Sequence, residues 1–350
     1  MARIKARSKG HVDFPVYWRA IKARLDGELA RSIPGYFKDL AAGRIEPIRE
    51  ILADGKRIRG CLVCLVSEAL GGRIEDAIPR AVAIECIHAA SLIHDDYVDE
   101  DARRRNRPAT WTVEGPRKAV LLGDLIFAVA IEKMTEISRW DGLAVAQAIA
   151  TVASGAYQEA IDPSDLARGV TEGRYRPELY ERIIHLKTGA LFGAAAKVGA
   201  VAAGASPAMR TLAFEWGARV GEAYQIADDL EEVLTLGARP ENSPVRLSRL
   251  APLFLCFSRE TNFHASHLAA GREADFREWF RNARPLLETR MRHKIAARLD
   301  MAAKALGDVP KTRDTRMLRA APSAIVRMGV DLTGSLSDLA LRQAVNSKTA

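Results

Sequence analysis

The chain has 350 residues, of which 48% are hydrophobic and 27% charged, which is ample for one large buried core or two ordinary ones. Its formal net charge of +8 indicates acidic ligands such as phosphates, nucleic acid or an anionic membrane face. Nucleic acid is excluded by the mixed sign of the charges, the aromatic content of 6% and the absence of a recognition motif.

From the first predicted element to the last, apolar residues recur with helical periodicity and strong helix formers fill the positions between them. No stretch is convincing as a strand, so the pattern predicts an all-α fold. Gly and Pro mark the joints. The expected helices span residues 14–31, 47–70, 75–98, 117–138, 141–160, 177–203, 206–236, 245–260, 268–306 and 313–328. Three of them, 75–98, 177–203 and 206–236, are apolar nearly all round and should be central.

The cysteines and the apolar segments bear on location. Cys61 and Cys64 form a lone CxxC inside an apolar helical pattern, so we expect buried thiols in a reducing compartment rather than a zinc site or a disulfide. The first residues are basic but lack the apolar core of a signal peptide. The most apolar run, 189–208, carries Lys197 midway and is typical of a buried helix. We therefore expect a cytoplasmic protein with no transmembrane segment.

Two central helices each carry an Asp pair near their C-terminal end, in SLIHDDYVDE and in YQIADDLEEV. In each, a third acid lies four residues after the first, so that both project from one helix face. The two sets are Asp95, Asp96 and Asp99, and Asp228, Asp229 and Glu232. Oxygen ligands without His or Cys suit hard cations, above all Mg²⁺, which shares its coordination between carboxylates and phosphate oxygens. The alternative is that these acids only pair with neighbouring arginines.

Basic residues that suit phosphate accompany the acids. They are Lys56 and Arg59 in DGKRIRG, Arg103, Arg104, Arg105 and Arg107 in ARRRNRP, and Lys187 beside Thr188 in HLKTGALF. Arg pairs with phosphate oxygens through a planar fork, and Lys acts as a mobile point charge. Taken singly, each would be a surface charge.

Together these motifs resemble those of the trans-isoprenyl diphosphate synthases, also called polyprenyl synthetases. The resemblance covers residues 45–235 and rests on GKRIRG, ECIHAASLIHDDYVDEDARRRNRPAT, LLGDLIFA, HLKTGALF and YQIADDLEE. It implies one all-α domain of about ten or more antiparallel helices around a central cavity, which we place at 13–334, and a homodimer. Residues 1–12 would be a disordered extension and 335–350 a flexible tail.

The resemblance also implies an activity, the head-to-tail condensation of an allylic diphosphate with isopentenyl diphosphate and release of pyrophosphate. Three Mg²⁺ ions would draw charge off the leaving diphosphate, and a dry apolar cavity would protect the allylic cation. The implied metal ligands are Asp95, Asp99 and Asp228, supported by Asp96, Asp229 and Glu232. Arg104 and Lys187 would hold the allylic diphosphate; Lys56, Arg59, His88 and Arg105 would hold isopentenyl diphosphate; Thr188 and Gln225 would face the cation.

The sequence departs from the family pattern after the second acidic set. Glu232 stands where the family has a third Asp. The Gly-Lys step that follows is replaced by LGARPENSPVRLSRL, which contains no Lys. Arg239, Arg246 or Arg249 could supply the missing cation. Asn106 also replaces the usual Gly after the arginines.

Product length follows from the residues that precede Asp95. Ala90 and Ser91, five and four positions earlier, are small where a bulky aromatic side chain would stop the growing chain. One helical turn of about 5.4 Å is comparable to one isoprene unit. The residues that close the bottom of the cavity would then lie deeper, near Ile87, Cys86 or a facing helix. A deeper cavity favours a product of C20 (geranylgeranyl diphosphate) or longer.

Two other readings remain open. A class I terpene cyclase would share the metal chemistry but would not need Lys56, Arg59, His88 and Arg105. A catalytically impaired or regulatory subunit of a heteromeric synthase would explain the altered segment after the second acidic set.

Overall fold

The computed structural model describes residues 13–38, 40, 45–105, 107–160, 165–236, 244–268, 272–307, 309 and 313–329, with the backbone alone at 166–167, 244–248, 313–314 and 329. In chain order the elements are α1 (Phe14–Tyr36), α2 (Glu46–Leu52), α3 (Ile58–Ala69), α4 (Ile74–Val98), β1 (Arg103–Arg104), β2 (Arg107–Pro108), α5 (Thr110–Glu114), α6 (Pro116–Ile137), α7 (Arg139–Glu159), α8 (Leu166–Thr171), α9 (Leu179–Ile183), the π-helix η2 (Ile184–Gly189), α10 (Ala190–Ala202), α11 (Pro207–Leu236), α12 (Pro244–Cys256), α13 (Ser258–Thr261), the 3₁₀-helix η3 (Ala265–Leu268), α14 (Glu273–Ala305) and α15 (Arg313–Gly329).

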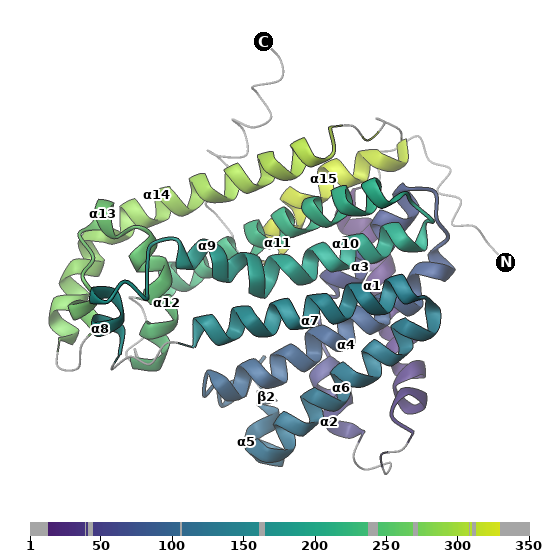
Figure 1. Cartoon of the computed structure of the whole chain (residues 1–350), viewed down its shortest axis with the longest axis horizontal. Helices are drawn as coiled ribbons and strands as arrows, with labels where there is room; N and C mark the ends of the chain where they lie inside the picture. Colours follow the sequence, from purple (N-terminus) through teal and green to yellow (C-terminus); the bar gives the residue numbers. More distant parts are fainter. Residues whose placement is uncertain are drawn as a thin grey trace.

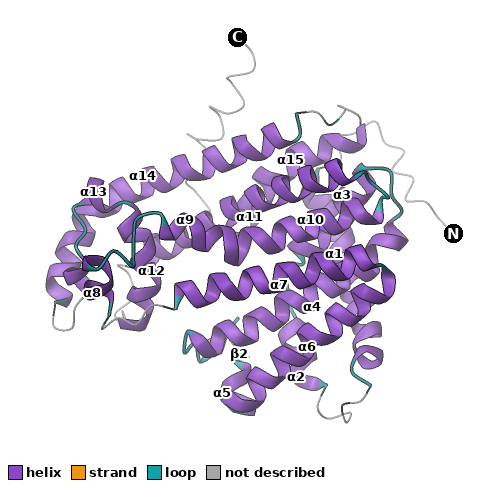
Figure 2. Cartoon of the chain, in the orientation of Figure 1, coloured by secondary structure: helices purple, strands orange, loops and turns teal. Residues whose placement is uncertain are grey.

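The long helices lie side by side in one bundle (Figure 1). Helix α10 is at its centre and packs on α3, α7 and α11, while α11 packs on α14 along its other side. Helix α4 packs on α3 and α6. Figure 2 shows helix in nearly every part of the chain that the structure describes. The all-α bundle predicted from the sequence is therefore confirmed.

Small residues allow α10 to sit deep in the bundle. A Cβ added to Gly217 of α11 would lie 2.6 Å from the carbonyl oxygen of Phe192, and one added to Gly199 would collide with the carbonyl oxygen of Val63 in α3. The helix backbones are thus in close contact on two sides of α10. This packing explains why most of the Ala- and Gly-rich run at 189–208 forms a buried helix, α10, which ends at Ala202, whereas the last two residues of the run begin α11.

The core is divided between two apolar clusters. The larger one joins α1, α3, α4, α6, α7 and α10 and is rich in Ala, Val and Ile. The smaller one joins α11, α12 and α14 and is aromatic, with the rings of Phe254 and Trp279 5.1 Å apart in an edge-to-face arrangement. Together they hold the helices around a cavity described below.

Several predicted boundaries were wrong. The helix expected at 47–70 is two helices, because Arg57 adopts a left-handed backbone conformation (φ 54°) between them. The helix expected at 177–203 contains η2, and the one expected at 268–306 begins at Glu273. The sequence also gave no sign of the β1–β2 pair, in which Arg104 faces Arg107.

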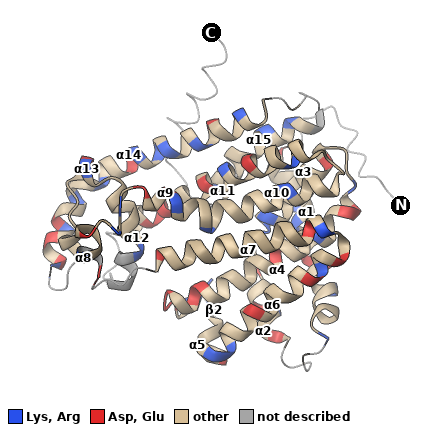
Figure 3. Ribbon diagram, in the orientation of Figure 1, with Lys and Arg blue, Asp and Glu red and all other residues tan. Residues whose placement is uncertain are grey.

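Charged residues of both signs are spread along the helices (Figure 3), with Lys and Arg interleaved with Asp and Glu along α14, while α10 contains one charged residue, Lys197. Cys61, Cys64 and Cys86 are buried free thiols, as expected for the first two. Among the described helices, none has the length and apolar character that a membrane span requires.

Candidate active site

A cavity of about 740 Å³ opens between α3, α4, α7, η2, α11 and α12. Nearly all the residues singled out in the sequence line it, although they come from segments up to 176 positions apart. They are Lys56, Arg59, His88, Ser91, Asp95, Asp99, Arg104, Arg105, Lys187, Thr188, Gln225, Asp228, Asp229 and Glu232. Ala90 and Asp96 are buried beside the cavity and do not line it.

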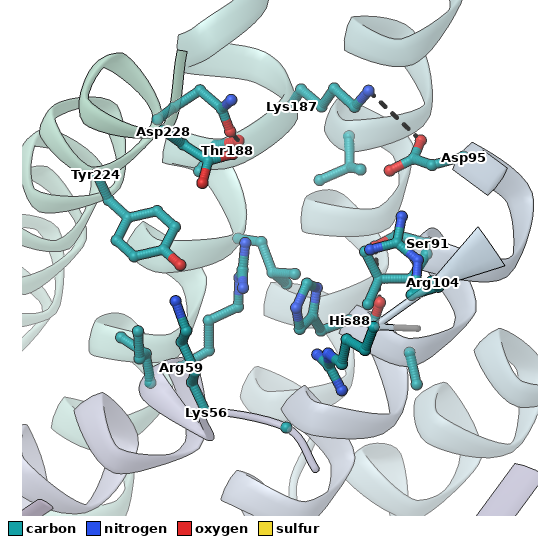
Figure 4. A pocket seen from close by; sticks show the side chains of 18 of the residues that line it. Lys56, Arg59, His88, Ser91, Asp95, Arg104, Lys187, Thr188, Tyr224 and Asp228 are labelled. Atoms are coloured by element: carbon teal, nitrogen blue, oxygen red, sulfur yellow. Dashed lines mark hydrogen bonds and ion pairs between the residues drawn. The ribbon is translucent and has the colours of Figure 1, made fainter. Parts of the chain in front are cut away.

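The two acidic sets and the group formed by Lys56 and Arg59 lie in different parts of this cavity, although Lys187 is a cation within the acidic part (Figure 4). Asp95 and Asp228 lie on opposite walls, with Lys187 and Thr188 between them, and Lys56, Arg59 and His88 gather at the other end. One end of the cavity is therefore suited to cations and the other to an anion.

The first acidic set lies at the C-terminal end of α4. Asp95 forms an ion pair with Lys187 (Oδ1 to Nζ, 3.6 Å), and Lys187 also contacts Glu159 at the end of α7. The neighbouring Gly155 lets α7 approach η2, since a Cβ there would lie 2.8 Å from the backbone nitrogen of Lys187. Burial raises the pKa of Asp99 to about 6, in spite of the positive charges of Lys187 and Arg249.

Asp96 is buried and does not line the cavity. Its carboxylate accepts hydrogen bonds from Nε of Arg104 at 2.6 and 2.9 Å, and Nη2 lies 2.5 Å from Oδ1. The pair joins α4 to β1, which fixes Arg104 at the cavity wall. Asp96 thus supports the site by holding an arginine.

The second acidic set lies on α11. Asp229 accepts hydrogen bonds from the Tyr180 hydroxyl at 2.7 Å and from Nε2 of Gln225 at 2.8 Å. Burial nevertheless raises the pKa of Asp229 to about 7, and burial followed by the charge of Glu231 raises the pKa of Asp228. Because burial disfavours the charged forms of Asp99, Asp228 and Asp229, a cation bound beside them would favour their ionised forms.

Thr188 and Gln225 are joined in the same network. The Thr188 hydroxyl donates to Oε1 of Gln225 at 2.7 Å. Because the only hydroxyl hydrogen is used in this bond, the Thr188 oxygen can offer only electron pairs to a neighbouring group. This arrangement suits a developing positive charge.

The basic end of the cavity is built by α3, α4 and the chain before β2. The Arg59 guanidinium lies 4.6 Å from the centre of the Phe192 ring, and its Nε is buried without a hydrogen-bond partner in the described structure. Burial, followed by the positive charge of Arg59, holds the pKa of His88 well below its usual range, so the imidazole is neutral. Lys56 donates to the carbonyl oxygen of Met328 and Arg105 to that of Ala53.

Only one of the three arginines considered for the missing Lys can be placed. Arg239 and the side chain of Arg246 lie outside the described residues. Arg249 of α12 lines the cavity, with Nη1 3.2 Å from Oδ2 of Asp99 and 3.1 Å from Oδ2 of Asp101. Asp101, which follows the first acidic set, is thus hydrogen-bonded to an arginine 148 residues away.

Sequence reasoning missed two further residues of this site. Tyr180 binds Asp229, and its position seven residues before Lys187, two turns earlier in the same helical pattern, was a usable signal. Glu159, the partner of Lys187, is the last residue of α7 and belongs to no motif, so nothing in the sequence marked it.

Comparisons with known proteins show which family the chain resembles. The model of the family described as polyprenyl synthetase matches residues 45–237. The short chain isoprenyl diphosphate synthase of Methanothermobacter thermautotrophicus is 40% identical over 190 residues, which are 53% of this chain and 56% of that protein. The (2E,6E)-farnesyl diphosphate synthase of Mycobacterium tuberculosis is 35% identical over 225 residues, which are 64% and 60% of the two chains. The matches therefore span little more than half of these relatives.

The fold comparison extends over more of the chain. The crystal structure of a polyprenyl synthase from Caulobacter crescentus CB15, complexed with calcium and isoprenyl diphosphate, superposes with a TM-score of 0.71 and 26% identity. The superposition covers 91% of this chain and 98% of that one.

Proposed function

The chain belongs to the polyprenyl synthetase family, and from that premise we propose that it joins an allylic diphosphate to isopentenyl diphosphate, head to tail, and releases pyrophosphate. The observation that carries the proposal is the lining of a single cavity by two acidic sets and a separate basic set. Two diphosphates of different roles need such a division.

Mg²⁺ is the cofactor we propose, with three ions in the complete complex. Within the described structure no three His, Cys, Asp or Glu side chains come close enough to hold an ion by themselves. Mg²⁺ does not need such a cage, because it keeps waters and takes oxygens from substrate phosphates. Asp95, Asp99 and Asp228 would hold the ions, with Asp229 and Glu232 beside them. Bound there, Mg²⁺ would withdraw negative charge from the leaving diphosphate.

The allylic substrate would lie at the acidic end. Lys187 and Arg104 would bind its diphosphate, with Arg104 oriented by Asp96. When the allylic C–O bond breaks, its electron pair leaves with pyrophosphate and the organic fragment becomes a cation. The oxygens of Thr188 and Gln225 would stabilise this cation, since their hydrogen bond directs electron pairs rather than hydrogens toward it.

Isopentenyl diphosphate would lie at the basic end, bound by Lys56, Arg59, Arg105 and the neutral His88. Its double bond attacks the allylic cation and forms the new C–C bond. The proton then lost restores a double bond, and the departing pyrophosphate accepts it. Fixing both substrates in one cavity makes this step effectively unimolecular.

We propose a product of C20 or longer. Ser91 lines the cavity and its hydroxyl donates to the His88 carbonyl of its own helix, so a small side chain faces the growing chain. Ala90, behind it, is fully buried. Incubation of the purified protein with isopentenyl diphosphate and dimethylallyl, geranyl or farnesyl diphosphate would identify the product, and farnesyl diphosphate alone would contradict this assignment.

The same incubation tests the activity itself. Elongated prenyl diphosphates that require Mg²⁺ and both substrates would support it. A hydrocarbon or alcohol formed from the allylic substrate alone would instead identify a terpene cyclase. If no product forms until a second protein is added, the chain is a subunit of a heteromeric synthase.

A homodimer is also part of the proposal. Apolar side chains are exposed along α6 and α7, among them Leu121 (67%), Trp140 (59%) and Leu143 (44%). A second copy could cover them, since apolar groups at a surface favour association. Light scattering on the purified protein would give a mass of two chains if the helices pair in this way.

We place the protein in the cytoplasm. Three buried free cysteines and the absence of a disulfide among the described residues suit a reducing compartment. A fluorescent fusion expressed in the native cell would show uniform cytoplasmic signal.

A further inference from the structure

Arg249 of α12 lines the acidic end of the cavity. Its Nη1 lies 3.2 Å from Oδ2 of Asp99 and 3.1 Å from Oδ2 of Asp101, and its Nη2 lies 3.4 Å from Oδ1 of Asp101. The guanidinium is therefore held by both oxygens of Asp101 and also reaches Asp99. Two of its nitrogens face one carboxylate, which fixes the plane of the group.

These contacts place a permanent positive charge on a carboxylate proposed to bind metal. The side chains of Asp99 and Arg249 are only 18% and 26% exposed, so solvent screens their attraction less than it would at the surface. A divalent ion that takes Asp99 must compete with this arginine.

Arg249 has further capacity to bind an anion. A guanidinium carries five N–H donors, and the contacts with Asp99 and Asp101 use three of them. Its Nε is buried and has no hydrogen-bond partner within the described structure. Release of Asp99 would free another donor on Nη1 while Asp101 still held the group in place.

We propose that Arg249, oriented by Asp101, neutralises Asp99 in the free protein and binds the allylic diphosphate once Asp99 has been taken by metal. This rests on the proposed function. It identifies the arginine that supplies the cation missing after the second acidic set, and it makes Asp101 a positioning residue. Binding of metal and of diphosphate would thereby be coupled through one side chain.

The first test measures metal binding without substrate, by electron paramagnetic resonance of Mn²⁺. Arg249→Gln should bind Mn²⁺ at least about threefold more tightly than the native protein, because the competing charge is gone. Arg249→Lys should stay near the native affinity. Arg272→Gln, which removes an exposed arginine from its pair with Asp275, is the matched control and should change nothing. Unchanged or weaker Mn²⁺ binding by Arg249→Gln would overturn the proposal.

The second test measures binding of inorganic pyrophosphate in the presence of Mg²⁺ by calorimetry. Arg249→Gln should weaken it at least about tenfold, and Arg249→Lys should weaken it less because the charge remains but the fork is lost. Asp101→Asn should weaken it only while Arg249 is present, so that the double variant binds like Arg249→Gln. Additive losses would show that Asp101 does not act through Arg249.

Both tests remain informative whatever the reaction is. The variants could change Mn²⁺ and pyrophosphate binding as expected while the native protein transfers no prenyl group. That result would refute the proposed function and support the role of Arg249. Circular dichroism and thermal unfolding of each variant would show that the fold is retained, and Arg249→Lys provides a conservative variant if Arg249→Gln does not fold.

Discussion

The hydroxyl of Tyr180 donates a hydrogen bond to Oδ2 of Asp229 across 2.7 Å and so ties α9 to the second acidic set. Asp229 is a buried carboxylate, and burial raises its pKa to about 7. The hydrogen bonds from Tyr180 and Gln225 act in the other direction and favour the ionised form. The charge of the second acidic set near neutral pH therefore depends on a tyrosine outside the family motifs used above.

Tyr180→Phe should raise the pKa of Asp229 further, because the charged carboxylate loses a donor. Such a bond is worth about 1.5–3 kcal/mol, which corresponds to a shift of about one to two pH units. We expect the acidic limb of the pH profile of kcat/KM to move upward by that amount, since a protonated Asp229 contributes no negative charge for metal. Tyr157→Phe, at a side chain that is 85% exposed, is the control. An unmoved limb would show that Asp229 does not govern it.

Asp95→Ala and Asp228→Ala should each lower turnover at least about a hundredfold, because each removes a carboxylate that would hold metal against the leaving diphosphate. Steady-state assays at saturating Mg²⁺ would measure this. Asp300→Ala, an exposed acid on α14, should have native turnover. Turnover retained by either of the first two variants would overturn the metal assignment.

Ser91→Phe should shorten the product without abolishing activity, because its ring would enter the cavity where the prenyl chain grows. Ala90→Phe should have the same effect at a cost of about 1–3 kcal/mol in stability, since Ala90 is fully buried and the ring must be accommodated by repacking. Chromatography of the dephosphorylated products would show the change. If both variants make a product of native length, residues other than Ser91 and Ala90 limit the length of the prenyl chain.

Glu222→Gln should destabilise the fold. Glu222 is 1% exposed, forms ion pairs with Arg219 at 2.9 Å and Arg298 at 2.6 Å, and lies 2.8 Å from Nδ1 of His185. Removing its charge leaves the partly buried Arg219 without this counter-charge and leaves Arg298 paired, among the described residues, with Glu181 alone, which costs about 1.5–3 kcal/mol at neutral pH. Urea unfolding would measure the loss, with Glu215→Gln on the exposed side of α11 as the control.

The pH dependence of this loss has a definite sign. Burial alone would raise the pKa of Glu222, but the hydrogen bonds from His185 and Arg219 lower this pKa below its ordinary value. The stability that Glu222 provides is therefore present above about pH 4.5, its ordinary pKa, and is lost as the pH falls through the lower folded value. The native protein and Glu222→Gln should become similar in stability in acid, and a constant difference would contradict this account.

Residues within motifs were easy to place from the sequence, because a helix fixes the spacing of side chains on one face. Asp95 and Asp99 reach the cavity as their spacing predicts, and so do Lys56 and Arg59. The direction of Asp96 was not predictable, since it depends on Arg104 in a two-residue strand that has no periodic signal. The contact between Arg249 and Asp101 depends on how a segment 148 residues away returns to α4, which local pattern does not encode.

The π-helical turn at Ile184–Gly189 ties the chemistry of the cavity to the packing of the core. A π-turn contains one residue more than an α-turn, and each residue of an α-helix corresponds to about 100° of rotation. Deleting one residue from this turn would rotate everything on one side of it relative to the other. Either Lys187 and Thr188 would leave the cavity, or α10 would lose its close contacts with α3 at Gly199 and with α11 at Gly217. The extra residue of the π-turn therefore sets the rotation of Lys187 and Thr188 relative to α10, so the active site and the packing of the core depend on it together.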